Sequence, residues 1–272
     1  MRKTILLTNS GGSFGRSMVL ALGKAGHVVY AGLHRLFGAS HIALLEAVRE
    51  SGIDLRIVDL DVLSQASVDA AVAHVIHDTG QLDVLVHNSG YQISGPAEAF
   101  TAEQLAHLYD MNVLSTQSVN RAVIPQFRRQ RHGLIVWVSS ISSAGSIPPY
   151  LAPYFSKASM DHVARIYAQE LAAAGIDCCT VLPRWTRGTA GGGARIDPSS
   201  VGDVIGEIVD LPCCERPLRV FVHCRDAVGQ SDKVYRRLTD PERQIVLPFR
   251  QRRPMRAGQY ASGVAIATHL KP

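Results

Sequence analysis

Seven short apolar runs, separated by segments with helical spacing, recur along the first 223 residues of this 272-residue chain. The runs are rich in β-branched residues and almost free of charge, as expected of strands that helices cover on both faces. They lie at 4–8, 27–33, 54–62, 82–88, 133–140, 176–183 and 218–223. The helical segments are 14–25, 40–51, 65–79, 101–131, 154–174 and 198–210. This alternation predicts one α/β domain with a doubly wound parallel sheet of about seven strands and right-handed crossovers.

Composition agrees with a globular protein and excludes several other classes. Hydrophobic residues make up 46% of the chain and charged residues 19%, with a net charge of +5. That mild positive charge permits anionic ligands but does not indicate nucleic acid. No run reaches the roughly 18 uncharged apolar residues of a membrane helix. The N-terminal "MRKTILLTNSGG" is interpreted as a first strand, because a signal peptide needs a longer apolar core and a cleavage site.

The cysteines form a poor disulfide framework, because their number is odd and two pairs are adjacent. They are Cys178, Cys179, Cys213, Cys214 and Cys224. We expect reduced thiols and a cytoplasmic protein. Cys213, Cys214, His223 and Cys224 follow no recognised zinc spacing, so the sequence predicts no metal site.

The chain loses its regular periodicity from about residue 225. We therefore expect a catalytic, dinucleotide-binding domain over 1–224 and a partly disordered C-terminal extension over 225–272. The extension carries a short basic run of Arg250, Arg252, Arg253 and Arg256. A solvated tail is the expected interpretation, and contact with an acidic partner or nucleic acid is the alternative.

A glycine-rich turn, "TNSGGSFG", joins the first strand to the first helix. In a sheet of this kind, such a turn holds a pyrophosphate through backbone N–H groups and the positive end of the helix dipole. The turn therefore predicts a phosphate site, and a turn without a ligand is the alternative.

At this turn the chain resembles the short-chain dehydrogenase/reductase family, whose loop runs Thr-Gly-x-x-x-Gly-x-Gly. Thr8 and Gly15 match, whereas Asn9 and Ser13 replace two glycines. Asn tolerates a left-handed backbone, so Asn9 is expected to make a similar turn, while Ser13 adds a side chain beside the pyrophosphate. The resemblance implies a Rossmann-type fold and cofactor contacts from Thr8, Asn9, Gly11, Gly12, Ser13, Phe14 and Gly15.

Further family marks extend the resemblance over positions 1–183. Asp61-Val62 after the third strand is similar to the pair that contacts adenine, and "HNSG" at 87–90 is similar to Asn-Asn-Ala-Gly after the fourth. The implied cofactor contacts are Asp61, Val62, Asn88, Ser89, Gly90, Lys157 and Pro183.

The end of the second strand bears on the choice between NADP and NAD. An acid there would bind the ribose hydroxyls of NAD and repel a 2′-phosphate, but this position is Leu33. His34 and Arg35 follow, and a guanidinium suits a phosphate. NADP is the expected cofactor and NAD the alternative, with Arg35 then a solvated loop residue.

The family resemblance also implies a proton-transfer site of four residues: Asn112, Ser140, Tyr154 and Lys157. In the family, a Tyr exchanges a proton with the substrate oxygen and a Lys lowers its pKa. A Ser binds the oxygen, and an Asn anchors water. The family spacing is Tyr-x-x-x-Lys, which here falls on Pro153. A one-residue change in spacing rotates the Tyr by about 100° around the helix axis and shifts it by about 1.5 Å along that axis, relative to the Lys.

Three interpretations of this slip stay open. Pro153 suits a first helical turn, which would absorb the deletion and leave Tyr154 as the acid. Alternatively, Tyr154 is structural in an inactive relative, or Tyr150 replaces it.

The sequence leaves the substrate unidentified, because only a short glycine-containing loop around Gly191-Gly192-Gly193 follows the sixth strand. Trp185 either walls the pocket or packs at the surface. The leading hypothesis is an NADP-preferring oxidoreductase that interconverts a carbonyl and a secondary alcohol on a small molecule. The rival is a catalytically silent nucleotide-binding sensor or assembly subunit. By resemblance, we expect a homo-oligomer that packs through helices 101–131 and 154–174.

Overall fold

A computed structural model describes residues 1–34, 38–49, 51–90, 95–139, 155–184, 197–223, 233–236 and 247–248. It contains one sheet whose strands lie in the order β3-β2-β1-β4-β5-β6-β7-β8-β9. The strands are β1 Thr4–Leu7, β2 Val28–Leu33, β3 Leu55–Asp59, β4 Val84–His87, β5 Gly133–Val138, β6 Ile176–Arg184, β7 Arg219–His223, β8 Lys233–Arg236 and β9 Leu247–Pro248.

The first seven strands pair in parallel, which confirms the predicted doubly wound sheet. β1 pairs with both β2 and β4, so the strand order reverses there. Beyond the expected seven, β8 pairs with β7 and β9 with β8, both antiparallel. Dinucleotides bind such sheets beyond the carboxyl ends of the strands at the point of reversal.

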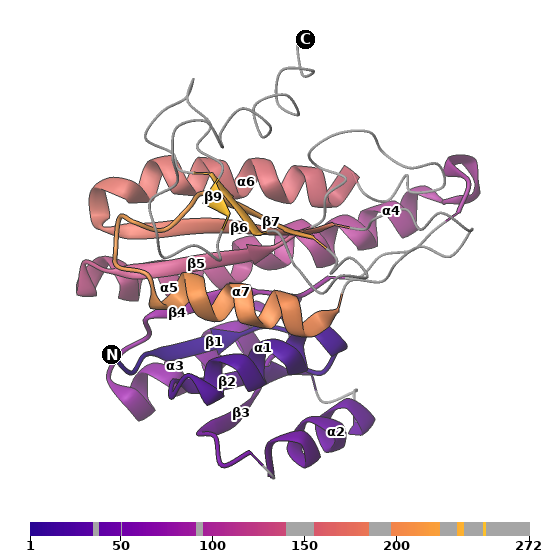
Figure 1. Cartoon of the computed structure of the whole chain (residues 1–272). Coiled ribbons are helices and arrows are strands. Elements are labelled where there is room, and N and C mark those ends of the chain that lie inside the picture. The colour runs from indigo at the N-terminus through magenta and orange to yellow at the C-terminus, as the bar shows by residue number, and fades with distance from the viewer. Residues whose placement is uncertain are drawn as a thin grey trace.

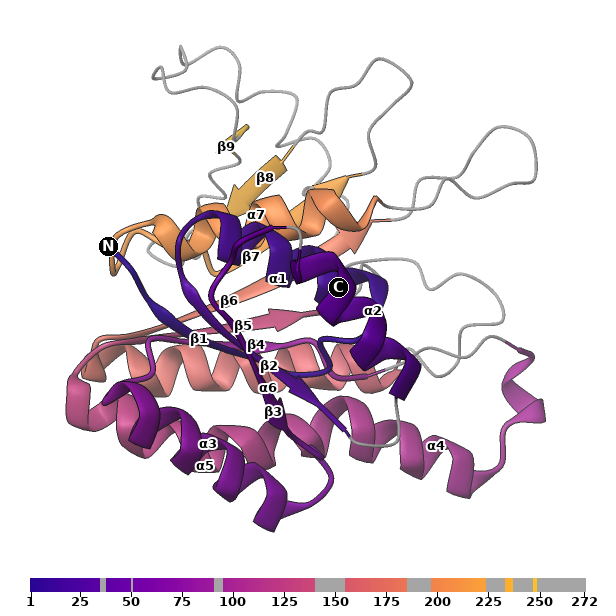
Figure 2. The same cartoon turned by 90° about the horizontal axis from the view of Figure 1, so that it is seen from below.

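Helices cover both faces of the sheet (Figures 1 and 2). On one side lie α1 Ser13–Lys24, α2 Gly38–Arg49 and α7 Pro198–Asp210. On the other lie α3 Gln65–Thr79, α5 Ser115–Gln130 and α6 Phe155–Leu171, with α4 Ala102–Tyr109 leading into α5. In the described part of the chain, short 3-10 turns are formed by η1 Ala97–Ala99 and η5 Ala172–Ala174.

Each face has its own apolar core, which explains the charge-free strands. Met18 of α1 and Ile205 of α7 pack against one face, and Phe127 of α5 and Met160 of α6 against the other. Strands β1, β2, β4 and β5 are buried along their whole lengths. Among the described residues, no helix is long and apolar enough to cross a bilayer.

The predicted helix 101–131 is interrupted by a wider turn. α4 and α5 are joined by a π-helical turn, η2 Asp110–Leu114. Such turns displace the side chains around them and are frequent at functional sites. Asn112 lies in this turn and is buried.

Candidate functional site

The turn after β1 is tied to the turn after β4 by Thr8. Its buried hydroxyl oxygen accepts hydrogen bonds from the backbone N–H groups of Asn88 and Ser89, each at 3.0 Å. The Asn88 side chain donates to the backbone carbonyl of Asn9 at 2.9 Å. Asn9 has φ 50°, so it takes the left-handed conformation expected where the family has glycine. The two turns therefore form one connected rim at the ends of adjacent strands.

Helix α1 starts beside this rim without a side-chain cap. The other described caps of α3, α4 and α7 are side chains of Ser64, Thr101 and Asp197, which accept hydrogen bonds from helix N–H groups. The N-cap of α1 is Gly12, which supplies no such acceptor, and its first turn carries no acid. An added Cβ at Gly12 would meet nothing within 4 Å. The start of α1 is therefore open to an anion.

Gly15 allows α1 to approach the turn closely. A Cβ there would lie 2.6 Å from the Ser10 carbonyl oxygen and 2.7 Å from that of Asn9. Ser10 is itself fixed by a backbone hydrogen bond to Gly32 of 3.0 Å. Glycine is therefore required at 15 by packing of helix against turn, while Gly12 faces open space. Between them, Ser13 and Phe14 start the helix, and Gly11 precedes it.

The ends of β2 and β3 lie side by side, with Leu33 opposite Asp59. Leu33 is buried, and no acid occupies its position. His34 follows, with its Nε2 3.6 Å from an Asp61 carboxylate oxygen. The same carboxylate accepts a hydrogen bond of 3.0 Å from the backbone of Leu63. His34 and Asp61 therefore lie together beyond the carboxyl ends of β2 and β3.

The structure describes one of the two other residues expected near the adenosine half of a dinucleotide. Val62 is buried beside Asp61. Arg35, the expected partner of a 2′-phosphate, lies outside the described residues.

Gly90, Asn112 and Lys157 converge beyond the end of β4. Gly90 has φ 128°, and a Cβ there would overlap the Asn112 side-chain oxygen and lie 2.8 Å from Lys157 Nζ. The Asn112 amide donates a hydrogen bond of 2.8 Å to the hydroxyl of Ser156, the residue before the lysine. A π-helical turn, the start of α6 and the turn after β4 thus meet at one point.

Lys157 is buried, with 6% of its surface exposed. Burial lowers the pKa of its amine to about 8, and the nearby Asp161 carboxylate partly opposes that change. Asp161 also accepts a hydrogen bond of 2.9 Å from Arg219 of β7. The lysine remains mostly cationic at neutral pH, inside a low-dielectric surrounding that strengthens its effect on neighbouring groups.

His87, the last residue of β4, is neutral at this pH. Burial lowers its pKa to about 4, the Asn120 hydrogen bond opposes this, and the Lys157 charge adds to it. Its Nε2 lies 2.8 Å from the Asn120 side-chain oxygen. His87 therefore does not compete with Lys157 for a negative charge.

Several predicted site residues fall outside the described part of the chain. They are Arg35, Ser140, Tyr150, Tyr154 and Trp185. The described residues thus bring together the Asn and Lys of the expected four, but not the Ser and Tyr. Pro183 is placed near the end of β6 and pairs in register with Val222.

Sequence reasoning missed the groups that surround Lys157. Ser156 orients Asn112, Asp161 offsets the lysine charge, and Arg219 approaches from another strand. The i,i+4 spacing of Lys157 and Asp161 on a helix was a usable signal. No local sequence pattern predicts the contact with Arg219, which lies on β7 and is brought to the site because β7 pairs with β6.

A doubly wound sheet with a glycine-rich turn at its reversal point defines a Rossmann-type domain, the class that holds dinucleotides. Residues 3–196 match the family model described as "short chain dehydrogenase". The chain belongs to the short-chain dehydrogenase/reductase family, whose members are oxidoreductases.

The curated relatives match part of their length. A 3-ketodihydrosphingosine reductase of Bacteroides thetaiotaomicron is 30% identical over 179 residues, covering 66% of this chain and 62% of the relative. Two uncharacterized oxidoreductases of Schizosaccharomyces pombe are 30% identical over 48% of this chain and 55% of their own length. The chain therefore spans a little over half of these relatives.

Solved structures share the fold. A metagenomic short-chain oxidoreductase in complex with NADP is 20% identical with a TM-score of 0.71, covering 82% of this chain and 96% of that one. An NAD⁺-bound xylitol dehydrogenase is 28% identical with a TM-score of 0.62, covering 66% and 69%.

Proposed function

We propose that the protein is an NADP-preferring oxidoreductase that interconverts a carbonyl and a secondary alcohol on a small molecule. The observation that carries this proposal is the meeting of Asn112, buried cationic Lys157 and Gly90 beyond β4. Burying a lysine ammonium group lowers the stability of the fold unless another group pairs with its charge. A ligand with hydroxyl or phenol groups at this point would use it.

The described residues fit a nicotinamide dinucleotide. Open N–H groups at Gly12 and the start of α1 suit its phosphates, and Lys157 suits the hydroxyls of its nicotinamide ribose. When bound, that cofactor supplies or accepts the hydride. His34, at the end of β2, and Arg35 are proposed to face the 2′-phosphate that distinguishes NADP from NAD.

The residues of the chain would handle the proton. A phenol has an ordinary pKa near 10 and needs a nearby cation to exchange protons at neutral pH. Lys157 is proposed to supply that cation to Tyr154, while Ser140 binds the substrate oxygen. Asn112, fixed by Ser156, is proposed to hold water that connects the lysine to solvent.

Titration with NADPH and NADH, followed by turnover on a panel of carbonyl compounds, tests the proposal. We expect NADPH to bind more tightly, and Arg35→Ala to narrow the preference by about 1–3 kcal/mol. An unchanged affinity ratio in that variant would refute the NADP assignment. No binding of either nucleotide at millimolar concentration would refute the proposal and the silent-binder alternative together.

Two phenylalanine variants test the acid. Tyr154→Phe is expected to lower turnover by about 10²–10⁴-fold with NADPH affinity unchanged. Tyr150→Phe serves as the matched control and should keep activity. If Tyr150→Phe is inactive instead, Tyr150 is the acid. If the unmodified chain binds NADPH but reduces no carbonyl of the panel, the silent nucleotide-binding function replaces the enzyme.

We also propose that the protein is a homo-oligomer that packs through its long helices. Leu114, the last residue of η2 and the N-cap of α5, is 49% exposed, and Ile166 of α6 is 54% exposed. A partner that packs against these helices would bury both apolar side chains. Light scattering should give a multiple of 29.5 kDa, and Ile166→Lys should reduce it.

A further inference from the structure

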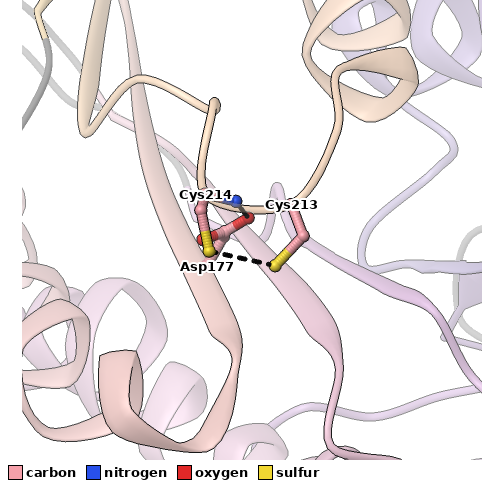
Figure 3. A group of neighbouring side chains, drawn as sticks. All are labelled: Asp177, Cys213 and Cys214. Carbon is pink, nitrogen blue, oxygen red and sulfur yellow. Dashed lines mark hydrogen bonds between the residues drawn. The ribbon is translucent and has the colours of Figure 1, made fainter.

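Two adjacent thiols and a carboxylate gather at the end of the sheet opposite the nucleotide rim (Figure 3). Cys213 and Cys214 lie in the connection between α7 and β7, and Asp177 lies at the start of β6. Their ligand atoms are all within 4.8 Å of one another, and the two sulfurs are 3.5 Å apart. The rim, by contrast, follows the carboxyl ends of the strands.

The cluster is built from two segments that hydrogen bonds hold in place. The Cys214 N–H donates to Asp177 Oδ2 at 3.1 Å, and the Arg216 guanidinium donates to the same oxygen at 2.8 Å. The Cys213 thiol lies 3.7 Å from the Gly175 carbonyl oxygen, in the turn before β6. Cys214 has φ 66°, a left-handed conformation that is uncommon for a residue with a Cβ. The connection is thus bent so that both thiols face the start of β6.

We propose that Cys213, Cys214 and Asp177 bind a thiophilic divalent cation such as Zn²⁺. Tetrahedral zinc with Zn–S bonds of about 2.3 Å separates two sulfurs by roughly 3.8 Å, close to the spacing observed. Both hydrogen bonds from the connection end on Asp177 Oδ2, and a carboxylate oxygen of Asp177 lies within 4.8 Å of both sulfurs. A water molecule completes the fourth position, because both cysteines are exposed.

Charge balance supports a divalent ion. Two thiolates and one carboxylate carry three negative charges, and Arg216 with a doubly charged cation balances them. The Arg216 side chain is 9% exposed, so its charge is held beside Asp177 rather than in bulk water. Thiolates select soft or borderline metals such as zinc over magnesium or calcium.

Binding must displace protons. Each thiol loses its proton as its S–H bond gives way to a sulfur–metal bond, and no electron is transferred. Affinity should consequently rise with pH.

The sequence pattern offered Cys213, Cys214, His223 and Cys224 as candidate ligands along one segment. Cys224 lies outside the described residues, and His223 is at the opposite end of β7 from the connection. The third ligand, Asp177, comes from a different strand start. A bound ion would link the start of β6 to the α7–β7 connection and stabilise the native state by mass action.

Calorimetry of the reduced, tag-free protein with Zn²⁺ tests the proposal. One ion should bind the unmodified chain, with affinity at least tenfold lower in Cys213→Ser, Cys214→Ser and Asp177→Asn. Asparagine keeps an oxygen acceptor for the Cys214 N–H, although it removes the negative charge paired with Arg216. Glu215→Gln, which removes a neighbouring exposed acid outside the cluster, is the matched control and should bind normally.

Two measurements on the unmodified chain keep the test independent of variant folding. Cd²⁺ should produce an ultraviolet thiolate-to-metal absorption band, and Zn²⁺ should protect the peptide containing Cys213 and Cys214 from alkylation by iodoacetamide. Absence of Zn²⁺ binding, equal binding by the cysteine variants, or alkylation that zinc does not slow would each overturn the proposal.

Discussion

Replacing Gly90 with alanine is expected to disturb the fold and the candidate site together. Gly90 has φ 128°, and a Cβ would overlap the Asn112 side-chain oxygen and lie 2.8 Å from Lys157 Nζ. Gly80 provides a matched control, because its φ is also positive, at 74°, but a Cβ there would meet nothing within 4 Å. Gly80→Ala therefore measures backbone strain alone.

The expected magnitudes follow from these two environments. Left-handed strain costs about 1–3 kcal/mol in either variant. In Gly90→Ala, Asn112 must also move, which breaks its 2.8 Å hydrogen bond to Ser156. Both partners are buried, so this loss adds about 1–3 kcal/mol. The melting temperature of Gly90→Ala should fall several degrees further than that of Gly80→Ala.

Urea denaturation followed by circular dichroism gives the stabilities, and calorimetry with NADPH gives the affinities. Gly90→Ala should bind NADPH more weakly and, if the proposed activity holds, turn over about a hundredfold more slowly, since displacements on the order of 1 Å cost that much. Gly80→Ala should bind NADPH normally. Equal stability losses together with equal NADPH affinities would refute the convergence of Asn112 and Lys157 on Gly90.

Three further predictions concern the rim and the buried lysine. Thr8→Val should lower the free energy of unfolding by about 2–4 kcal/mol, because two backbone N–H groups lose their acceptor. Thr8→Ser keeps the hydroxyl acceptor, so urea denaturation should show a free energy of unfolding close to that of the unmodified chain. Gly15→Ala should weaken NADPH binding in calorimetry, because its Cβ would lie 2.6 Å from a backbone oxygen, while Gly12→Ala, in open space, should keep the fold. Burial lowers the pKa of Lys157 to about 8, so between about pH 8 and 10.5 the unfolded chain binds more protons than the folded chain. The free energy of unfolding should therefore increase by roughly 3 kcal/mol as pH rises through that window. Urea denaturation at several pH values should show this increase in the unmodified chain and not in Lys157→Met.

The parallel sheet was predictable because its signal is local and repeated. Each buried strand is a charge-free run, and each helix between strands has a periodic apolar face. β8 and β9 gave no comparable signal. β8 is "KVYR", four residues with a charge at each end, and it joins the sheet by antiparallel pairing with β7.

The candidate site was predictable only where a residue type marks its own position. Asn9 and Gly15 stand in a recognisable turn, and Lys157 begins a recognisable helix segment. The π-helical turn that aims Asn112 has no sequence signature, and Arg219 reaches Asp161 from 58 residues away. The burial of Lys157 and its lowered pKa do not follow from local spacing. Both depend on how α6, the η2 turn and the turn after β4 pack together.

The energetics of Lys157 argue for a ligand rather than for packing. An apolar side chain of similar length would fill the same volume without the desolvation that lowers the lysine pKa to about 8. Asp161 offsets the charge only in part, since it also accepts a hydrogen bond from Arg219. The cation is therefore left with capacity to attract an oxygen at the open end of β4. A ribose hydroxyl of the proposed dinucleotide would use that capacity whether or not Tyr154 performs proton transfer, so the proposal treats cofactor binding and turnover as separable.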